Sequence, residues 1–300
     1  NAVTGVNSLV VALSFGLPMS FDERVHVGPV VTRPEPSPVE ELAAQEPPTG
    51  GHLAREDRAS AEVLIRHLFA PSEHEIDGIE YHVAYLLAER AIGGDIVDVY
   101  HFDNGNVALS IADISGKGAA AAIHAALVKY GLRCYASEGL TAERVIRSLD
   151  RAYIENNAFE RTESFASLFT GILDHDRRSM TYASAGHEPV ILYKPGVGAE
   201  VLEPTAPIIG VFDDQHHLFK QRHVDITPGT ILVATTDGVT EARSRDGDFY
   251  GMERLVASVS VAMRADPSME GLIEHVLADV SRFCDGRLND DIAALAVRIF

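Results

Sequence analysis

Four acidic positions in this sequence share one local design, in which an apolar stretch meets a carboxylate that stands beside a small residue. They are Gly94-Asp95 before IVDVYHF, Asp113 before Ser115-Gly116, Asp237-Gly238 after ILVATT, and Asp290-Asp291 before IAALAV. Taken singly, each aspartate is better explained as a turn or cap residue, because Asp-Gly is a favoured turn pair. Taken together, acids at strand ends could converge at one end of a rigid sheet.

Carboxylates that converge need a cation, because close negative charges raise one another's pKa and resist ionising together. All-oxygen ligation with bound waters suits Mg²⁺ or Mn²⁺, whereas zinc would call for Cys and His groupings that this sequence does not contain. Two such ions, about 3.5 to 4 Å apart, can activate water for in-line attack on a phosphoryl group. The acids therefore predict a divalent-metal site if the fold brings them together.

The stretch ADISGKGAAAA (112–122) places Lys117 between two glycines, like a loop that grips phosphate. A P-loop would need another glycine five residues before Gly116 and a Ser or Thr after the lysine, and both are absent. Gly116 and Gly118 could let the backbone approach an anion, because they lead into a helix whose N-terminus favours negative charge. Alternatively, they allow that helix to pack closely on the sheet. Both interpretations stay open. We assign the chemistry to Asp113, and Lys117 has no assigned role.

Histidine and serine chemistry has weaker support. None of the 13 histidines falls in an HExxH array, and no serine or cysteine stands in a GxSxG elbow. His187 in SAGHEP stands out because it follows a predicted strand and a glycine. A structural hydrogen bond is favoured for it over catalysis, although both remain open.

Net charge and cysteine content bound the partners and the compartment. With 25 Lys+Arg against 44 Asp+Glu, the charge of −19 would repel nucleic acid and anionic membranes, and we expect neither as a partner. Cys134 and Cys284 are too few for a disulfide framework, and we expect both to be reduced and buried in a cytoplasmic protein. The apolar run at 8–19 lacks the basic flank of an export signal and the length of a membrane span.

The elements that must position the acids come in groups of strands and groups of helices. Strands are predicted over 79–87, 95–102, 107–114, 165–174, 180–186, 189–194, 216–226, 230–236 and 291–300, and helices over 119–136, 141–156, 251–263 and 268–284. Hairpin-length turns favour antiparallel pairing, and this grouping favours an α+β fold over a parallel α/β sheet. We therefore predict a two-sheet sandwich with outer helices.

Proline content sets the beginning of the chain apart. Seven of the 14 prolines fall at or before Pro48, and residues 29–51 resemble an extended linker. We predict an N-terminal extension with a Pro-rich linker over 1–52, a linker or regulatory helix over 53–72 and the main folded domain over 73–300.

Six segments in order resemble one family over about residues 62–300. They are GGDIVDV (93–99), ADISGKGAAAA (112–122), SLFTGILD (167–174), ASAGHEPVIL (183–192), ATTDGVTEA (234–242) and NDDIAAL (289–295). These segments resemble the metal-dependent protein phosphatase family (PPM, protein phosphatase 2C-like), in its bacterial SpoIIE/RsbU-like branch. The 73–300 domain would then be a PPM-type phosphatase domain.

The resemblance implies a four-layer α-β-β-α sandwich, with two antiparallel sheets flanked by helices, and a phosphoserine/phosphothreonine phosphatase with two Mn²⁺ or Mg²⁺ ions. Carried over by motif, the implied ligands, which would act in catalysis through the bound metals, are the carboxylates of Asp95, Asp113, Asp237 and Asp290 and the carbonyl of Ile114. Further candidates are Gly94, Asp291 and, as an acid just outside the ligand set, Asp98.

Three departures from the family pattern affect neighbours of the ligands. Ile96-Val97 replaces an aromatic pair, Ala293 replaces a frequent threonine, and Ser115 stands where eukaryotic relatives place a histidine. No general acid can be named from the sequence.

The resemblance also implies a phosphorylated protein substrate, of which an anti-sigma-factor antagonist is the family's frequent example. The helix predicted over 55–69 is expected to couple an upstream signal or a homodimer contact to the metal site. The alternative is a phosphatase-like docking module with weak or no catalysis. A nucleotide cyclase, suggested by GGD alone, lacks the acidic and aromatic residues that should follow it.

Overall fold

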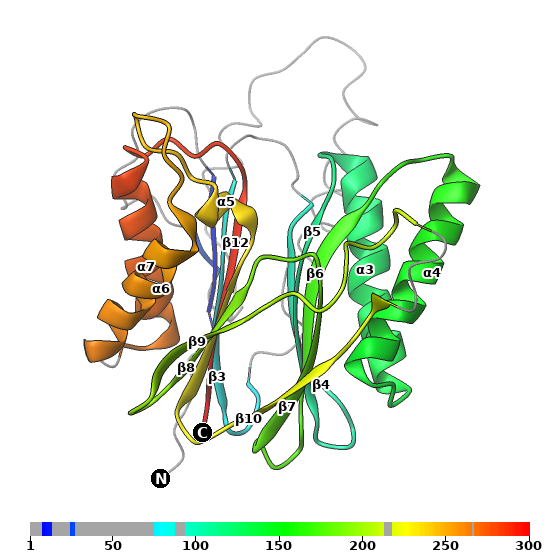
Figure 1. Cartoon of the computed structure of the whole chain (residues 1–300), viewed down its shortest axis with the longest axis horizontal. Coiled ribbons are helices and arrows are strands. Elements are labelled where there is room, and N and C mark those ends of the chain that lie inside the picture. The colour runs from blue at the N-terminus through cyan, green and yellow to red at the C-terminus, as the bar shows by residue number, and fades with distance from the viewer. Residues whose placement is uncertain (1–7, 14–24, 28–74, 88–93, 213–217, 266) are drawn as a thin grey trace, which may run out of the picture.

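The computed structural model describes residues 8–13, 25–27, 75–87, 94–212, 218–265 and 267–300. These residues form two β-sheets packed face to face between two pairs of helices (Figure 1). The predicted four-layer α-β-β-α sandwich is confirmed. The helix predicted over 55–69 and most of the predicted N-terminal extension lie outside the described residues.

The first sheet has seven strands in the order β2-β1-β3-β12-β11-β8-β9. Their bounds are Val25–Val27, Ser8–Leu13, Ile79–Leu87, Ile292–Ile299, Thr230–Thr235, Val190–Lys194 and Gly198–Leu202. All neighbours run antiparallel except β1, which runs parallel to β3. The sequence did not predict β9.

The second sheet has five strands in the order β10-β7-β6-β5-β4. Their bounds are Arg222–Asp225, Ser179–Ala185, Ala166–Leu173, Val107–Ile114 and Ile96–His101. The predicted hairpin is β4–β5, whose register pairs Ile96 with Ala112. Within the described residues β4 and β10 are the edge strands, and β10 is shorter than the predicted 216–226.

Helices cover the outer face of each sheet (Figure 1). α3 (Ala119–Ser137) and α4 (Ala142–Glu160) pack on the second sheet, and α6 (Gly251–Ala262) and α7 (Met269–Phe283) pack on the first. Two short helices, α5 (Asp237–Thr240) and the 3-10 helix η2 (Met263–Ala265), were not predicted.

Alternation along the strands divides the apolar side chains among three cores. Val97 and Leu109 pack between the sheets, whereas Ile96 on the neighbouring position packs under α3 and α4. Fully burying such a side chain contributes about 1.5 to 3 kcal/mol relative to leaving it exposed. The upper ends of β5 and β12 and the helix α5 lie at the same end of the sandwich (Figure 1).

Surface features refine two expectations. Cys284 is buried as expected, but Cys134 is exposed on α3, because it lies on the helix face turned away from the sheet; both are free thiols.

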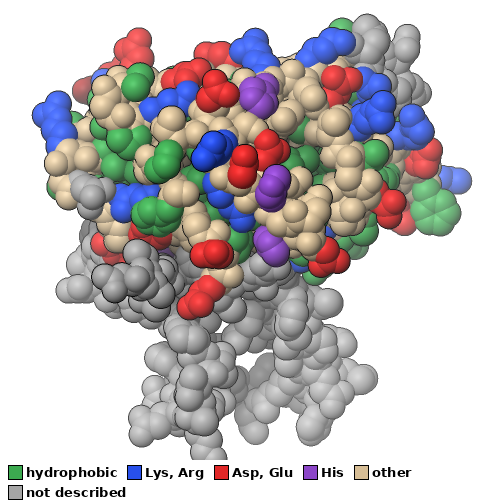
Figure 2. Space-filling view, turned by 90° about the horizontal axis from the view of Figure 1, so that it is seen from below, with side chains coloured by type: hydrophobic (Ala, Val, Ile, Leu, Met, Phe, Trp, Pro, Cys, Tyr) green, Lys and Arg blue, Asp and Glu red, His purple; other side chains and the backbone are tan. Residues whose placement is uncertain are grey.

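In the described part of the chain, no helix is long and apolar enough to cross a membrane. The face opposite the upper end carries interspersed acidic, basic and histidine side chains (Figure 2).

Candidate metal centre

Asp95 and Asp113 lie opposite each other at the open end of the β4–β5 hairpin. The register pairs Ile96 with Ala112, and the next step outward brings the two aspartates face to face. Side chains alternate along a strand, so both carboxylates lie on the face of Val97, which is buried between the sheets. The two carboxyl groups share a hydrogen bond.

Burial and mutual repulsion raise the pKa of both groups. The pKa of Asp95 is raised first by burial and next by the charge of Asp113. Burial also raises the pKa of Asp113, with further increases from Asp290 and Asp291, while Lys117 lowers it. These charges interact although the residues come from distant parts of the chain. The cluster therefore favours a cation or a shared proton.

Asp237 extends this cluster from the other sheet. It is the first residue of α5, directly after β11. Burial, followed by the charges of Asp113, Glu241, Asp290 and Glu188, raises the pKa of Asp237 to about 7. The structure thus brings the acids predicted on the two sheets into electrostatic contact.

Two glycines allow the acid-bearing segments to approach each other. A Cβ on Gly94 would lie 2.2 Å from the carbonyl oxygen of Ile114, and a Cβ on Gly238 would lie 2.0 Å from the carbonyl oxygen of Asp291. Both distances are far too short for any side chain. Only glycine therefore allows these backbone segments to approach so closely, and Gly94 lets the Ile114 carbonyl lie beside the residue that precedes Asp95.

Asp290 and Asp291 occupy different environments. The Asp291 residue is 7% exposed and its backbone N–H donates to Asp290 Oδ1 at 3.0 Å. The side chain of Asp290 is 56% exposed, and its Oδ1 lies 3.2 Å from Lys117 Nζ. Across the described residues, no three His, Cys, Asp or Glu side chains are gathered closely enough to form a ready-made metal site.

Thr236 orients Asp95 from the opposite sheet, a role that sequence reasoning missed. Its hydroxyl donates to Asp95 Oδ2 at 2.8 Å. The Thr236 hydroxyl oxygen accepts the backbone N–H of Ala293 at 2.9 Å, and the Thr236 N–H donates to the Ala293 carbonyl at 3.0 Å. Although Ala293 replaces a threonine that is frequent in the family, its backbone N–H and carbonyl still take part in this hydrogen-bond network. The only signal in the sequence was the threonine that precedes Asp237.

Ser167 and His187 continue the row of polar side chains along the second sheet. Ser167 pairs with Asp113 across β5 and β6, and its hydroxyl lies 3.0 Å from His187 Nδ1. His187 is 2% exposed, and burial lowers its pKa to about 3. The imidazole is therefore neutral near pH 7, which favours the structural interpretation over a role as general acid.

Ser115 anchors the segment before β6. The backbone N–H of Phe165 donates to the Ser115 hydroxyl at 2.9 Å, and the Ser115 N–H donates to the Phe165 carbonyl at 2.9 Å. The Ser115 hydroxyl also lies 3.3 Å from that of Ser164. This residue fixes a neighbouring loop where eukaryotic relatives have a histidine.

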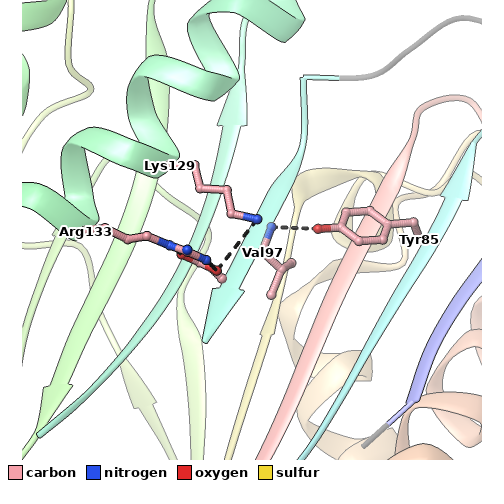
Figure 3. Close-up of polar contacts among 5 residues, drawn as sticks. Tyr85, Val97, Lys129 and Arg133 are labelled. Atoms are coloured by element: carbon pink, nitrogen blue, oxygen red, sulfur yellow. Dashed lines mark hydrogen bonds and ion pairs between the residues drawn. The ribbon is translucent and has the colours of Figure 1, made fainter. Parts of the chain in front are cut away.

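Asp98 lies on the opposite face of β4 from Asp95 and faces α3. Arg133 donates to it through Nε at 2.6 Å and Nη2 at 2.5 Å, and Lys129 Nζ lies 3.8 Å away. Figure 3 shows Lys129 and Arg133 reaching from α3 toward β4. Asp98, the acid expected just outside the ligand set, therefore contacts the helix α3 on the face of β4 opposite Asp95.

Tyr85 holds β4 from the other side. The backbone N–H of Val97 donates to the Tyr85 hydroxyl oxygen at 2.8 Å (Figure 3). Burial raises the pKa of Tyr85 above its usual value, and the charges of Asp95 and Asp98 act in the same direction. The edge strand that follows Asp95 is thus tied to both neighbouring layers.

The family comparison agrees with this geometry. The family model of stage II sporulation protein E (SpoIIE) matches residues 103–300. The chain belongs to this family. It is a member of the SpoIIE/RsbU branch of the metal-dependent protein phosphatases, and its sandwich is the fold of that group. Asp113, Asp237 and Asp290 lie within the matched residues, and Asp95 lies just before them.

Two curated relatives of this SpoIIE-family chain are similar over much of its length. Protein IcfG of Synechocystis sp. is 28% identical over 233 residues, which cover 69% of this chain and 36% of IcfG. Phosphoserine phosphatase RsbU of Bacillus subtilis is 28% identical over 204 residues, which cover 67% of this chain and 58% of RsbU. The chain therefore spans less than two thirds of either relative.

Solved structures share the fold of this SpoIIE-family chain. The SiaA-PP2C domain of Pseudomonas aeruginosa has a TM-score of 0.65 at 17% identity, over 83% of this chain and 99% of that domain. The catalytic domain of the serine threonine protein phosphatase PstP, in complex with 2 manganese ions, has a TM-score of 0.55 at 13% identity, over 74% of this chain and 98% of that one.

Proposed function

We propose that this chain is a serine/threonine protein phosphatase of the RsbU/SpoIIE type that hydrolyses phosphoserine or phosphothreonine on a partner protein. One observation carries the proposal. Carboxylates from both sheets interact electrostatically at one end of the sandwich, where burial and repulsion raise the pKa of Asp95, Asp113 and Asp237. Such a cluster is costly without a cation.

The residues at the centre fit a divalent metal. Their donors are carboxylate and carbonyl oxygens, which suit Mg²⁺ and Mn²⁺, and Gly94 leaves room for the Ile114 carbonyl at the centre. The proposed ligands are Asp95, Asp113, Asp237, Asp290 and the Ile114 carbonyl. Two bound ions would supply a nucleophile from water near neutral pH and neutralise charge on the transferred phosphoryl group. The 2 manganese ions of PstP support this metal class and count.

Residues of this chain prepare the centre for that chemistry. Thr236 holds one Asp95 oxygen, so the carboxylate presents a fixed orientation. Asp237, with a pKa of about 7, can lose its proton to become a ligand near neutral pH. Neutral His187 fixes Ser167 beside Asp113 and leaves the protonation of the leaving serine to another group.

The substrate is proposed to be a phosphorylated partner protein. RsbU is named a phosphoserine phosphatase, and an anti-sigma-factor antagonist is the substrate that the family resemblance implies. A cytoplasmic location fits such a substrate. Residues 73–300 would form the phosphatase domain, and residues 53–72 a linker or regulatory helix that couples an upstream signal or a homodimer contact to the centre. Residues 1–52 would form an extension, of which strands β1 and β2 join the first sheet beside β3.

Asp113→Asn tests the function. It keeps the shape of the side chain and removes its charge, so we expect loss of Mn²⁺-dependent hydrolysis of a phosphoserine protein and of para-nitrophenyl phosphate by more than about 100-fold. Asp225→Asn on β10 is the control, because its side chain is 90% exposed. Equal turnover by wild type and Asp113→Asn would refute the assignment, and a wild type that neither turns over nor binds Mn²⁺ would favour the docking module.

A further inference from the structure

Lys117 connects the two halves of the proposed metal centre. It lies in the turn between β5 and α3, and its Nζ is 3.2 Å from Oδ1 of Asp290 in the turn before β12. Because β5 belongs to the second sheet and β12 to the first, this ion pair spans the two sheets.

The turn that carries Lys117 is uncrowded. Gly116 and Gly118 have φ values of 96° and 80°, in the left-handed region that glycine adopts without strain. A Cβ built on either glycine would meet no atom within 4 Å. The lysine is thus flanked by two open positions, in contrast to Gly94 and Gly238, whose surroundings are closed.

The pair with Lys117 competes with metal binding for the same oxygen. Asp290 Oδ1 already faces Lys117 Nζ and accepts the Asp291 N–H, and no ready-made group of three ligands is present among the described residues. The side chains of Lys117 and Asp290 are 41% and 56% exposed. Ion pairs as exposed as this are weak, and a divalent ion brings twice the charge to the cluster.

We propose that Lys117 is an internal counter-ion of the centre, which holds Asp290 in the metal-free protein and is displaced when a divalent ion binds. The proposal rests on the metal centre of the proposed function. It assigns Lys117 the role of setting the metal affinity: its ammonium neutralises the acids before metal binds and opposes the ion that replaces it.

Calorimetric titration of the metal-free full chain with Mn²⁺ tests this role. Lys117→Met removes the charge and keeps most of the side-chain length, and we expect it to bind Mn²⁺ roughly threefold to tenfold more tightly at low ionic strength. Lys117→Arg keeps the charge and should stay close to wild type. Lys194→Met is the matched control, because Lys194 forms a similar pair with Glu200 at 3.4 Å between β8 and β9.

The outcomes separate this role from the proposed function. Unchanged or weaker Mn²⁺ binding by Lys117→Met, with wild type binding normally, overturns the counter-ion role and leaves the phosphatase assignment intact. Equal tightening by Lys194→Met also overturns it, because net charge alone would then account for the effect. Absence of Mn²⁺ binding in wild type overturns both. Circular dichroism on each variant establishes that the fold is retained.

Discussion

At the scale of single residues, the centre depends on a hydrogen bond that crosses from one sheet to the other. Thr236 of the first sheet donates to Asp95, which lies 141 positions earlier in the chain beside the second sheet, and Thr236 is itself held within the first sheet by accepting from the Ala293 N–H. A hydrogen bond to a charged carboxylate is stronger than one between neutral groups. The orientation of Asp95 is therefore set by a residue that is not itself a proposed ligand.

Thr236→Val should weaken Mn²⁺ binding about 10- to 100-fold, because it removes the hydroxyl that orients a ligand and keeps the side-chain shape. Thr236→Ser should retain most of the affinity. Thr235→Val is the control: the Thr235 hydroxyl is buried and has no hydrogen-bond partner in the described part of the chain. Mn²⁺ titration of the three variants measures the effect. Similar losses of Mn²⁺ affinity in Thr236→Val and Thr235→Val would show that the Thr236 hydroxyl has no specific role in orienting Asp95.

The pKa of Asp237 predicts how stability depends on pH without metal. Its carboxyl has a usual pKa of 3.8 and is raised to about 7 in the folded chain. Between these values the folded state binds more protons than the unfolded state, so the free energy of unfolding falls as pH rises from about 4 to about 7. Urea unfolding of metal-free Asp237→Asn should show a shallower fall than wild type, and parallel curves would contradict the shift.

At the scale of elements, β4 is an edge strand whose position is fixed by the layers on either side. Asp98 joins it to α3 through Arg133 and Lys129, and Tyr85 joins it to β3 through the Val97 N–H. Lys129 is completely buried, and its pKa is lowered to about 8, first by burial. Asp95 leads directly into this strand, so the same contacts also position a proposed ligand.

Arg133→Met should cost about 3 to 5 kcal/mol of stability, because it leaves Asp98 buried without its main partner. Arg147→Met is the control: Arg147 pairs with Glu143 within α4 on a partly exposed face, and such pairs contribute about 0.3 to 0.5 kcal/mol. Chemical denaturation measures both. A loss of less than 1 kcal/mol for Arg133→Met would mean that Lys129 alone satisfies Asp98.

Elements were predictable where apolar periodicity was strong. The strand over 107–114 was found with its predicted bounds as β5, because nearly every side chain in it is buried. β9 was missed because Ala199 and Glu200 are exposed and leave no alternating pattern. The four residues of α5 are too few to show a helical period. The acids could be picked out from local context and family resemblance, whereas Thr236 and Lys117 depend on packing between distant segments.

At the scale of the whole molecule, the centre joins two sheets that are also held together by an apolar core and by the hydrogen bond between Val97 and Tyr85. A ligand that binds only the folded chain stabilises it by about 2.7 kcal/mol when present at 100 times its Kd. Mn²⁺ should therefore raise the melting temperature of wild type, and Asp113→Asn should abolish the increase. Mn²⁺-free buffer with NaCl added to equal ionic strength is the control, and an equal increase there would indicate charge screening alone.

The division of the acids between the sheets has a mechanical consequence. Asp95 and Asp113 lie on or beside strands of the second sheet, and Asp237 and Asp290 lie beside strands of the first. Apolar side chains tolerate small sliding better than hydrogen-bonded ladders do, since dispersion contacts are non-directional. A shear of one sheet across the other would change the spacing of the carboxylates while every strand pairing stayed intact. The distances between the proposed metal ligands would therefore change before any hydrogen bond within a sheet was lost.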